Sequence, residues 1–325
     1  MRTDGRPVLF DIVIDAVVIT RPGNVANKLN HAIVAAMRYV PRSVAWRFSR
    51  RYIAGSQLSD ALRMVRALNA SGCSATIDVL GEDSMTYDQV AESRELYLEA
   101  LAEIHAASLD CGISVKLSEM GLRFDVPRCA ETMGALLANA REHGNFVRID
   151  MEDSSVTSVT LDIYRELRQR FDNVGIVIQA CLRRSASDIA NLLSGGRTDV
   201  RLCKGIYVEP EEISFRDAGE IRDSYRMLLE QLLAGDANRI AIATHDPLLI
   251  AHAEEMIEKT GLSRDRYEFQ MLLGVAGPLR RKLVKKGHPL RVYVPFGERW
   301  YAYSMRRLRE NPNIAGHIVR DLFRR

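Results

Sequence analysis

From about residue 74 onward the chain repeats one unit, a short apolar run followed by a turn and a segment with helical periodicity. Most of these runs are continuously apolar, which is typical of parallel strands that are covered on both sides. We predict eight such strands: SATIDVL (74–80), ISVKLS (113–118), FVRIDM (146–151), GIVIQAC (175–181), VRLCKG (200–205), RIAIAT (239–244), YEFQML (267–272) and LRVYVPF (290–296). Eight β-α units without a break in composition favour an α/β fold with one closed (β/α)8 barrel of the TIM type, which needs about 250 residues.

A doubly wound sheet is the alternative fold for such a repeat. However, no predicted strand is followed by GxGxxG or GxxxxGK[ST], so the usual nucleotide-binding signatures are missing. The helix signals agree with the repeat, because Thr86 and Gln89 form a capping box and Gly144 stops the next helix. We therefore favour the barrel.

The residues before the barrel read as helical. The clearest segment, LSDALRMVRALNA, places four apolar residues on one stripe: Leu58, Leu62, Val65 and Leu68. We predict an N-terminal helical arm over residues 1–70, packed on a catalytic barrel of residues 71–325. Within the arm, the arginine-rich SVAWRFSRRY (43–52) is either a solvated segment or a surface that contacts anionic lipid through Trp46 and Phe48.

Bulk properties exclude several classes of protein. The formal net charge of +3 is small and predicts no nucleic-acid partner. The five cysteines are scattered without a CxxC spacing, which fits reduced thiols in a cytoplasmic protein. Two aspartates interrupt the N-terminal apolar run VLFDIVIDAVVIT, and no stretch of about 18 uncharged apolar residues occurs. We expect neither a signal peptide nor a membrane-spanning helix.

Polar side chains stand in or just after nearly every predicted strand. They include Lys116, Asp150, Gln179, Arg201, Lys204, Thr244, His245, Glu268, Gln270 and Tyr293. Charged groups inside apolar strands are costly unless they are paired or bind a ligand. Because function gathers at the C-terminal ends of barrel strands, we predict an active site there.

Several kinds of chemistry can be compared at this site. A metal centre is disfavoured, because His245 is the one histidine at a strand end and no HxH occurs, and there is no GxSxG motif for a serine nucleophile. Lys116 could form a Schiff base if burial lowered its pKa, although Asp150 on the next strand favours the charged form. We expect Lys116, Arg201 and Lys204, together with Arg306 and Arg307, to form a basic pocket that suits an anionic cofactor and an anionic substrate. A non-enzymatic barrel that serves only to bind ligands remains an alternative.

Eight motifs occur in order, about one per strand region: SVKLSEMG, RIDMEDS, IVIQACLRR, VRLCKGIY, ATHD, EFQMLLG, VYVPFG and YSMRRLRENP. From about Leu80 to Pro312 the chain resembles the proline dehydrogenase family, and within it the single-function bacterial enzymes. The resemblance implies an FAD-dependent barrel that oxidises L-proline to Δ1-pyrroline-5-carboxylate by hydride transfer from ring C5 to flavin N5. This reaction is the first step of proline catabolism to glutamate. Electrons then pass to a membrane quinone, which implies a peripheral contact with the inner face of the plasma membrane.

The resemblance also implies roles for individual residues. Asp150 matches the family's active-site aspartate, and Arg201 matches the arginine near the reactive N5 side of the flavin; both are expected to be catalytic. The substrate residues are those that clamp its carboxylate, wall its ring or close the site: Lys116, Arg306, Arg307, Tyr207, Leu272, Tyr293, Tyr303 and Glu82. The cofactor residues are Met151, Gln179, Arg201, Lys204, Gly205, Ile206, Thr244 and His245. Cys181 and Ile206 depart from the commoner tyrosine and alanine of the family.

The stretch WYAYSMRRLRE (300–310) carries the last of these residues. Tyr303 and Arg307 are spaced i and i+4 and lie on one helix face, seven and eleven residues past Phe296. A final helix packed outside the barrel would carry both away from the site. We therefore predict that this helix lies over the active-site mouth, and that LSDALRMVRALNA fills the vacancy outside the last strand.

Overall fold

The computed structural model describes residues 46, 49–81, 83–196, 198–235, 237–301 and 303–304. The chain divides into two units, one spanning Arg50–Trp300 and the other comprising Met1–Ser49 with Tyr301–Arg325. In the described part of the second unit, the Ser49 hydroxyl donates to the Ser304 hydroxyl over 2.8 Å.

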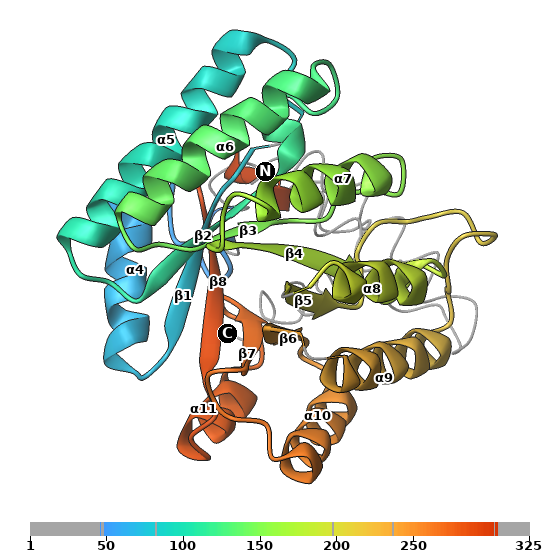
Figure 1. Ribbon diagram of the computed structural model, residues 1–325. Coiled ribbons are helices and arrows are strands. Elements are labelled where there is room, and N and C mark those ends of the chain that lie inside the picture. Colours follow the sequence, from blue (N-terminus) through green and yellow to red (C-terminus); the bar gives the residue numbers. More distant parts are fainter. Residues whose placement is uncertain are drawn as a thin grey trace, which may run out of the picture. The chain divides into compact units, whose positions relative to one another are not determined.

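Eight parallel strands close into a barrel in sequence order, as predicted (Figure 1). The strands are β1 (Ser74–Val79), β2 (Cys111–Val115), β3 (Val147–Ile149), β4 (Val174–Gln179), β5 (Asp199–Cys203), β6 (Arg239–Ala243), β7 (Tyr267–Leu272) and β8 (Leu290–Phe296). β1 pairs with β8 as well as with β2, which closes the barrel and excludes the doubly wound alternative. The predicted strands match these bounds to within a few residues, and β2 begins two residues earlier than predicted.

The helices alternate with the strands and surround the barrel (Figure 1). They are α4 (Leu58–Ala70), α5 (Tyr87–Ala106), α6 (Val126–Glu142), α7 (Thr157–Arg168), α8 (Ser185–Ser194), α9 (Ala218–Ala234), α10 (Pro247–Thr260) and α11 (Gly277–Lys285), with a short 3-10 helix η1 (Leu117–Met120) after β2. At the start of α5 the Thr86 side chain accepts from the Gln89 backbone N–H, as a capping box requires. The reciprocal bond runs from the Met85 N–H to the Gln89 side chain, one residue earlier than in the standard box.

Helix α4 packs against β8 and β1, outside the last strand. Leu62, Val65 and Leu68 of its predicted apolar stripe are buried, and Leu58 is partly buried against the core. Two backbone hydrogen bonds tie the preceding segment to the end of β8, from the Ala54 N–H to the Pro295 carbonyl at 2.9 Å and from the Gly297 N–H to the Gly55 carbonyl at 3.0 Å. This much of the predicted arrangement is confirmed. The place of the final helix stays a prediction, because Arg306 and Arg307 lie outside the described residues. The domain boundary at residue 70 also stays a prediction.

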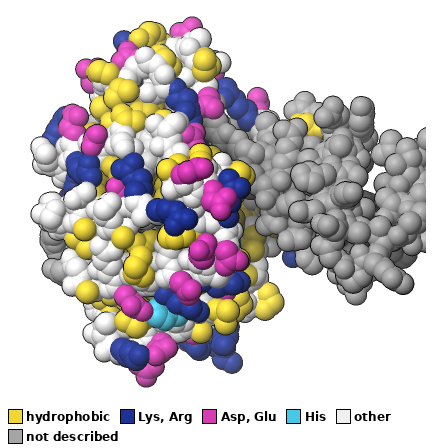
Figure 2. Space-filling view, turned by 90° about the vertical axis from the view of Figure 1, so that its right-hand side faces the viewer, with side chains coloured by type: hydrophobic (Ala, Val, Ile, Leu, Met, Phe, Trp, Pro, Cys, Tyr) yellow, Lys and Arg dark blue, Asp and Glu magenta, His cyan; other side chains and the backbone are white. Residues whose placement is uncertain are grey.

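The surface of the barrel unit mixes charge and apolar side chains. On the face shown in Figure 2, lysine and arginine side chains alternate with acidic and apolar ones. In the part of the chain that the structure describes, no helix combines the length and the apolar character needed to cross a membrane.

Candidate active site

Asp150 is the centre of a polar cluster inside the C-terminal half of the barrel. It directly follows β3 and accepts hydrogen bonds from three other strands. Its Oδ1 accepts from the Ser114 hydroxyl at 3.1 Å and from Arg201 Nη1 at 2.7 Å. Its Oδ2 accepts from the Tyr293 hydroxyl at 2.7 Å. The Arg201 guanidinium also lies over the Tyr293 ring, 5.4 Å from the centroid. The predicted pair of Asp150 and Arg201 is therefore in direct contact.

Lys116 follows β2 and makes a buried ion pair with Asp78 of β1. The Lys116 Nζ lies 2.6 Å from Asp78 Oδ1, and the Asp78 side chain is fully buried. Burial alone would lower the pKa of Lys116, but Asp78, Asp150 and Glu119 raise it above its ordinary value. The lysine is thus held in its charged form, which suits a carboxylate ligand and opposes Schiff-base formation.

Glu119 of η1 is a buried acid beside this ion pair. Its side chain accepts from the Tyr97 hydroxyl at 3.2 Å, while Oε1 has no hydrogen-bond partner among the described residues. Burial raises the pKa of Glu119 to about 8, although Lys116 opposes the rise. Glu119 is therefore mostly protonated at neutral pH, and the charged groups nearest to it, Asp78 and Lys116, neutralise each other.

The strand ends of β4 and β5 carry the first group of expected cofactor residues. The Gln179 side-chain amide donates to the Glu152 carbonyl at 2.9 Å, which leaves its oxygen as an acceptor. Gly205 has φ +97°, and a Cβ there would lie 2.3 Å from the Cys181 sulfur. This position therefore requires glycine, and the backbone of Gly205 lies close to both Cys181 and Gln179.

The second group follows β6, where Thr244 is buried and His245 is partly buried. His245 Nε2 accepts from the Leu272 backbone N–H at 2.9 Å. Burial, together with Lys204, lowers the pKa of His245 to about 4. A neutral imidazole that accepts at Nε2 carries its proton at Nδ1, which can donate to a ligand.

Lys204 stands beside this group and is held by Asp246, at the start of α10. The Lys204 Nζ and the Arg222 Nε lie 2.6 and 2.7 Å from Asp246 Oδ2. Burial alone would raise the pKa of Asp246, but hydrogen bonds from Lys204 and Arg222 hold it at about 2. Lys204 is thus kept in a fixed position at the mouth of the barrel.

The remaining expected residues have mixed outcomes. Met151 is buried next to Asp150, Leu272 and Tyr207 are partly buried, and Ile206 is 43% exposed in the loop after β5. Tyr303 is helical and belongs to the second unit. Glu82, Arg306 and Arg307 lie outside the described residues. The roles expected for all of these residues stay predictions.

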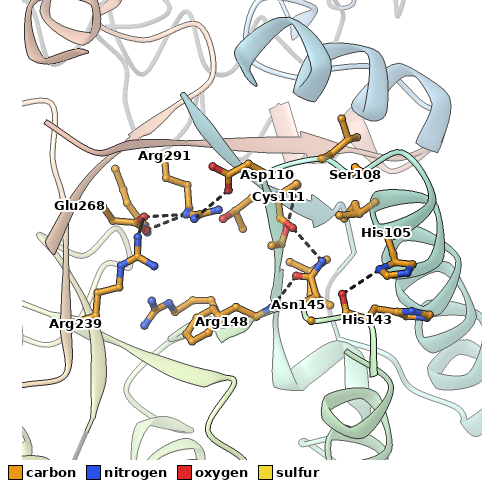
Figure 3. Close-up of a pocket in the computed structure, with 18 of the residues that line it drawn as sticks. His105, Ser108, Asp110, Cys111, His143, Asn145, Arg148, Arg239, Glu268 and Arg291 are labelled. Atoms are coloured by element: carbon orange, nitrogen blue, oxygen red, sulfur yellow. Dashed lines mark hydrogen bonds and ion pairs between the residues drawn. The ribbon is translucent and has the colours of Figure 1, made fainter. Parts of the chain in front are cut away.

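A cavity of about 450 Å³ lies at the other end of the barrel, where the strands begin. Figure 3 shows Arg239 and Arg291 meeting at Glu268, with the Arg148 side chain nearby. Arg201 and Gln270 also line this cavity, so they connect the barrel's two ends. The N-terminal end of such barrels usually serves stability, and the predicted chemistry is at the C-terminal end.

Sequence reasoning missed two partners of the predicted residues. Asp78 is the hydrogen-bonded partner of Lys116, and Ser114 donates to Asp150. Asp78 could have been found, because it is a charged residue inside the apolar strand SATIDVL, which is the signal that singled out Lys116. Ser114 carries no such signal.

Comparisons with known proteins relate this chain to one family. The family described as proline dehydrogenase matches residues 61–320. Proline dehydrogenase 2 of Bacillus subtilis (strain 168) is 37% identical over 267 residues, which cover 82% of this chain and 87% of that protein. Proline dehydrogenase of Deinococcus radiodurans is 33% identical over 290 residues, covering 87% of this chain and 92% of the relative.

A solved structure is also similar. It is proline utilization A (PutA) from Bdellovibrio bacteriovorus inactivated by N-propargylglycine, with a TM-score of 0.77 and 25% identity. The match covers 94% of this chain and 36% of the PutA chain, so this chain spans about a third of that protein. The family match and the close relatives extend over most of the sequence, and the chain belongs to the proline dehydrogenase family.

Proposed function

We propose that this chain is an FAD-dependent proline dehydrogenase that oxidises L-proline to Δ1-pyrroline-5-carboxylate. Its membership of the family supports the reaction class. The observation that carries the proposal is the cluster around Asp150, where Ser114, Arg201 and Tyr293 converge on one carboxylate at the C-terminal end of the barrel. Such a cluster is the kind of preorganised polar site that enzymes use to place a reacting group.

The donor set at the strand ends fits a flavin. The Gln179 amide oxygen can accept from a ring N–H, and the His245 Nδ1–H can donate to a ring or ribose oxygen. Lys204 supplies a fixed cation for a phosphate. The backbone at Gly205 has no space for a side chain, which allows close approach of a planar ring. We propose Met151, Ile206 and Thr244 as further contacts.

The residues of the chain then have distinct tasks. The flavin, when bound, supplies the acceptor for a hydride from ring carbon C5 of proline to flavin N5. Lys116 binds the proline carboxylate, and Arg306 and Arg307 complete this clamp. Asp150 holds Arg201 and Tyr293 in fixed positions, and Arg201 stabilises negative charge that develops beside it.

Other residues shape and close the substrate site. We propose that Tyr207, Leu272, Tyr293 and Tyr303 enclose the proline ring and exclude water, and that Glu82 pairs with an arginine of the last helix to close the site. Electrons leave to a quinone-type acceptor. This requires a peripheral contact between a cytoplasmic enzyme and the inner face of the plasma membrane, for which the segment 43–52 is the candidate.

The test uses purified full-length protein supplied with FAD. We expect flavin absorbance that co-purifies with the protein, and reduction of an artificial dye that depends on L-proline. Lys116→Met should keep the flavin and raise KM for proline strongly, because the substrate carboxylate loses its cation. Lys286→Met removes a surface lysine that pairs with Glu254 and is the matched control. Its KM should equal that of the wild type.

A colourless protein that takes up no FAD and reduces no dye would refute the proposal. The Schiff-base alternative is tested separately by borohydride reduction in the presence of the substrate. Trapping of a covalent adduct that disappears in Lys116→Met would favour a lyase. We expect no adduct, because Lys116 is held in its charged form beside Asp78.

A further inference from the structure

A chain of buried polar side chains runs from Asp150 to the opposite end of the barrel. Arg201 Nη1 contacts Asp150, and Arg201 Nε donates to Gln270 Oε1 at 2.6 Å. The Gln270 Nε2 donates in turn to Glu268 Oε1 at 2.5 Å. Glu268 is held by Arg239 and Arg291, at 2.6 and 3.0 Å. Figure 3 shows these two arginines meeting at Glu268 on the cavity side.

The order of the hydrogen-bonded side chains determines how the Gln270 amide is oriented. A guanidinium only donates hydrogen bonds and a carboxylate only accepts them. An amide between the two satisfies both when its oxygen faces Arg201 and its nitrogen faces Glu268. Burial alone would raise the pKa of Glu268, but Arg291 and Arg239 hold it below its ordinary value. Glu268 is therefore a carboxylate, and it keeps the amide in this one orientation.

The backbone leaves room for this contact between β5 and β7. Arg201 pairs in register with Ala241 of β6, and Ala241 pairs with Glu268 of β7. The intervening strand thus contributes a small residue at this level. Arg201 is 6% exposed, Gln270 is 6% exposed and Glu268 is 3% exposed. Hydrogen bonds between a neutral amide and buried charged groups are strong, and leaving one unmade is costly.

We propose that Glu268 and Gln270 are positioning residues, which hold Arg201 in place for the reaction, and that Glu268 acts through the Gln270 amide. This inference rests on the proposed function, in which Arg201 acts beside the reacting centre. Without the Glu268 carboxylate the Gln270 amide is free to turn, and the Nε–H of Arg201 then loses the fixed acceptor to which it donates. The guanidinium then keeps its contacts with Asp150, Ser114 and the Tyr293 ring and points less uniformly at the substrate.

The first test does not depend on activity. In protein labelled with ¹⁵N-arginine, the Nε–H signal of Arg201 is identified by its loss in Arg201→Lys. We expect this signal to shift and to exchange faster with solvent in Gln270→Met and in Glu268→Gln. Glu254→Gln, which changes a paired glutamate on α10, is the matched control and should leave the signal unchanged. An Arg201 signal that is the same in wild type and both variants would overturn the proposal.

The second test is a double-mutant cycle on turnover with L-proline. Glu268→Gln should lower kcat about tenfold with little change in KM, since the substrate clamp is intact. In the Gln270→Met background the same change should lower kcat by less than about twofold, because the intermediary is already gone. Equal factors in the two backgrounds would mean that Glu268 acts by another route, which overturns the proposal.

The two tests separate this inference from the proposed function. A wild-type protein that does not oxidise proline refutes the proposed function, and the Arg201 signal still decides the positioning roles. If Glu268→Gln does not accumulate as folded protein, Gln270→Met alone decides, since Glu268 there keeps its two arginine partners. An unmoved Arg201 signal in Gln270→Met then rules the idea out.

Discussion

Replacing Glu119 by glutamine should make the protein more stable at alkaline pH. Glu119 is 1% exposed and has Tyr97 as its hydrogen-bonded neighbour. Burial raises its pKa from 4.5 to about 8. The folded state therefore favours the protonated acid, and glutamine resembles that form in shape and charge. Gly81 lies close to this side chain, because a Cβ added at Gly81 would come 1.8 Å from Glu119 Oε1. Glutamine at position 119 has the same size as glutamate and keeps this fit.

The sign follows from proton binding in the two states. Between about pH 4.5 and 8 the folded protein keeps a proton on Glu119 that the unfolded chain releases. The stability from this group is complete below pH 4.5, falls as the pH rises, and is lost above 8. At pH 7 the loss spans two and a half pKa units, or about 3 kcal/mol. Glu119→Gln escapes this loss.

The assay is urea unfolding of wild type and Glu119→Gln at several pH values from 5 to 9. We expect the two free energies of unfolding to approach each other near pH 5 and to separate as the pH rises. Glu103→Gln on the exposed face of α5 is the control and should follow the wild type. Parallel curves, or a variant that is less stable than the wild type at pH 9, would refute the reasoning.

The same titration should affect substrate binding. With Glu119 protonated, Asp78 and Lys116 form a neutral pair. Above about pH 8 the ionised Glu119 adds a negative charge beside the proposed carboxylate clamp. The ratio of KM for L-proline in wild type to that in Glu119→Gln should therefore rise above pH 8. A ratio that stays constant would separate Glu119 from the substrate site.

Three further changes have defined outcomes. Tyr293→Phe removes one of the three donors to Asp150. In a dye assay kcat for L-proline should fall about tenfold, while the flavin absorbance per protein stays unchanged. His245→Gln should flatten the acid side of the thermal-stability profile. The depressed pKa of His245 gives stability that is present above about pH 6.5 and lost as the pH falls through 4, and a wild type no more acid-sensitive than the variant would contradict this. Gly205→Ala forces a Cβ against Cys181 at φ +97° and should lower flavin absorbance per protein and cost about 1–3 kcal/mol in urea unfolding.

The fold could be predicted because its signals are local. Each strand is a short apolar run, and the first helix of the repeat begins at a capping residue, Thr86. The apolar stripe on LSDALRMVRALNA predicted a helix that packs on the barrel. The vacancy expected outside the last strand predicted that this helix packs against β8. Local periodicity and chain connectivity thus determine the order of elements in a barrel.

The candidate site could be predicted only in part, because its contacts join residues that are far apart in sequence. Asp150 and Arg201 were expected from their motifs, and they are in contact. Tyr293 was expected as an apolar wall, but its hydroxyl also donates to Asp150. A motif can indicate that a residue matters without showing which atom is used or which partner it has.

The missing information concerns which strands meet inside the barrel. Side chains that point inward form layers from alternate strands. Arg201 on β5 therefore reaches Asp150 after β3 and Gln270 on β7, and each lies two strands away rather than on a neighbour. Lys116 was expected to be kept charged by Asp150 on the following strand, which does raise its pKa, but its hydrogen-bonded partner is Asp78 on the preceding strand. In a barrel of this kind, polar residues inside strands should be compared with those of both adjacent and next-but-one strands, and the second comparison predicts the contacts of Arg201 with Asp150 and Gln270.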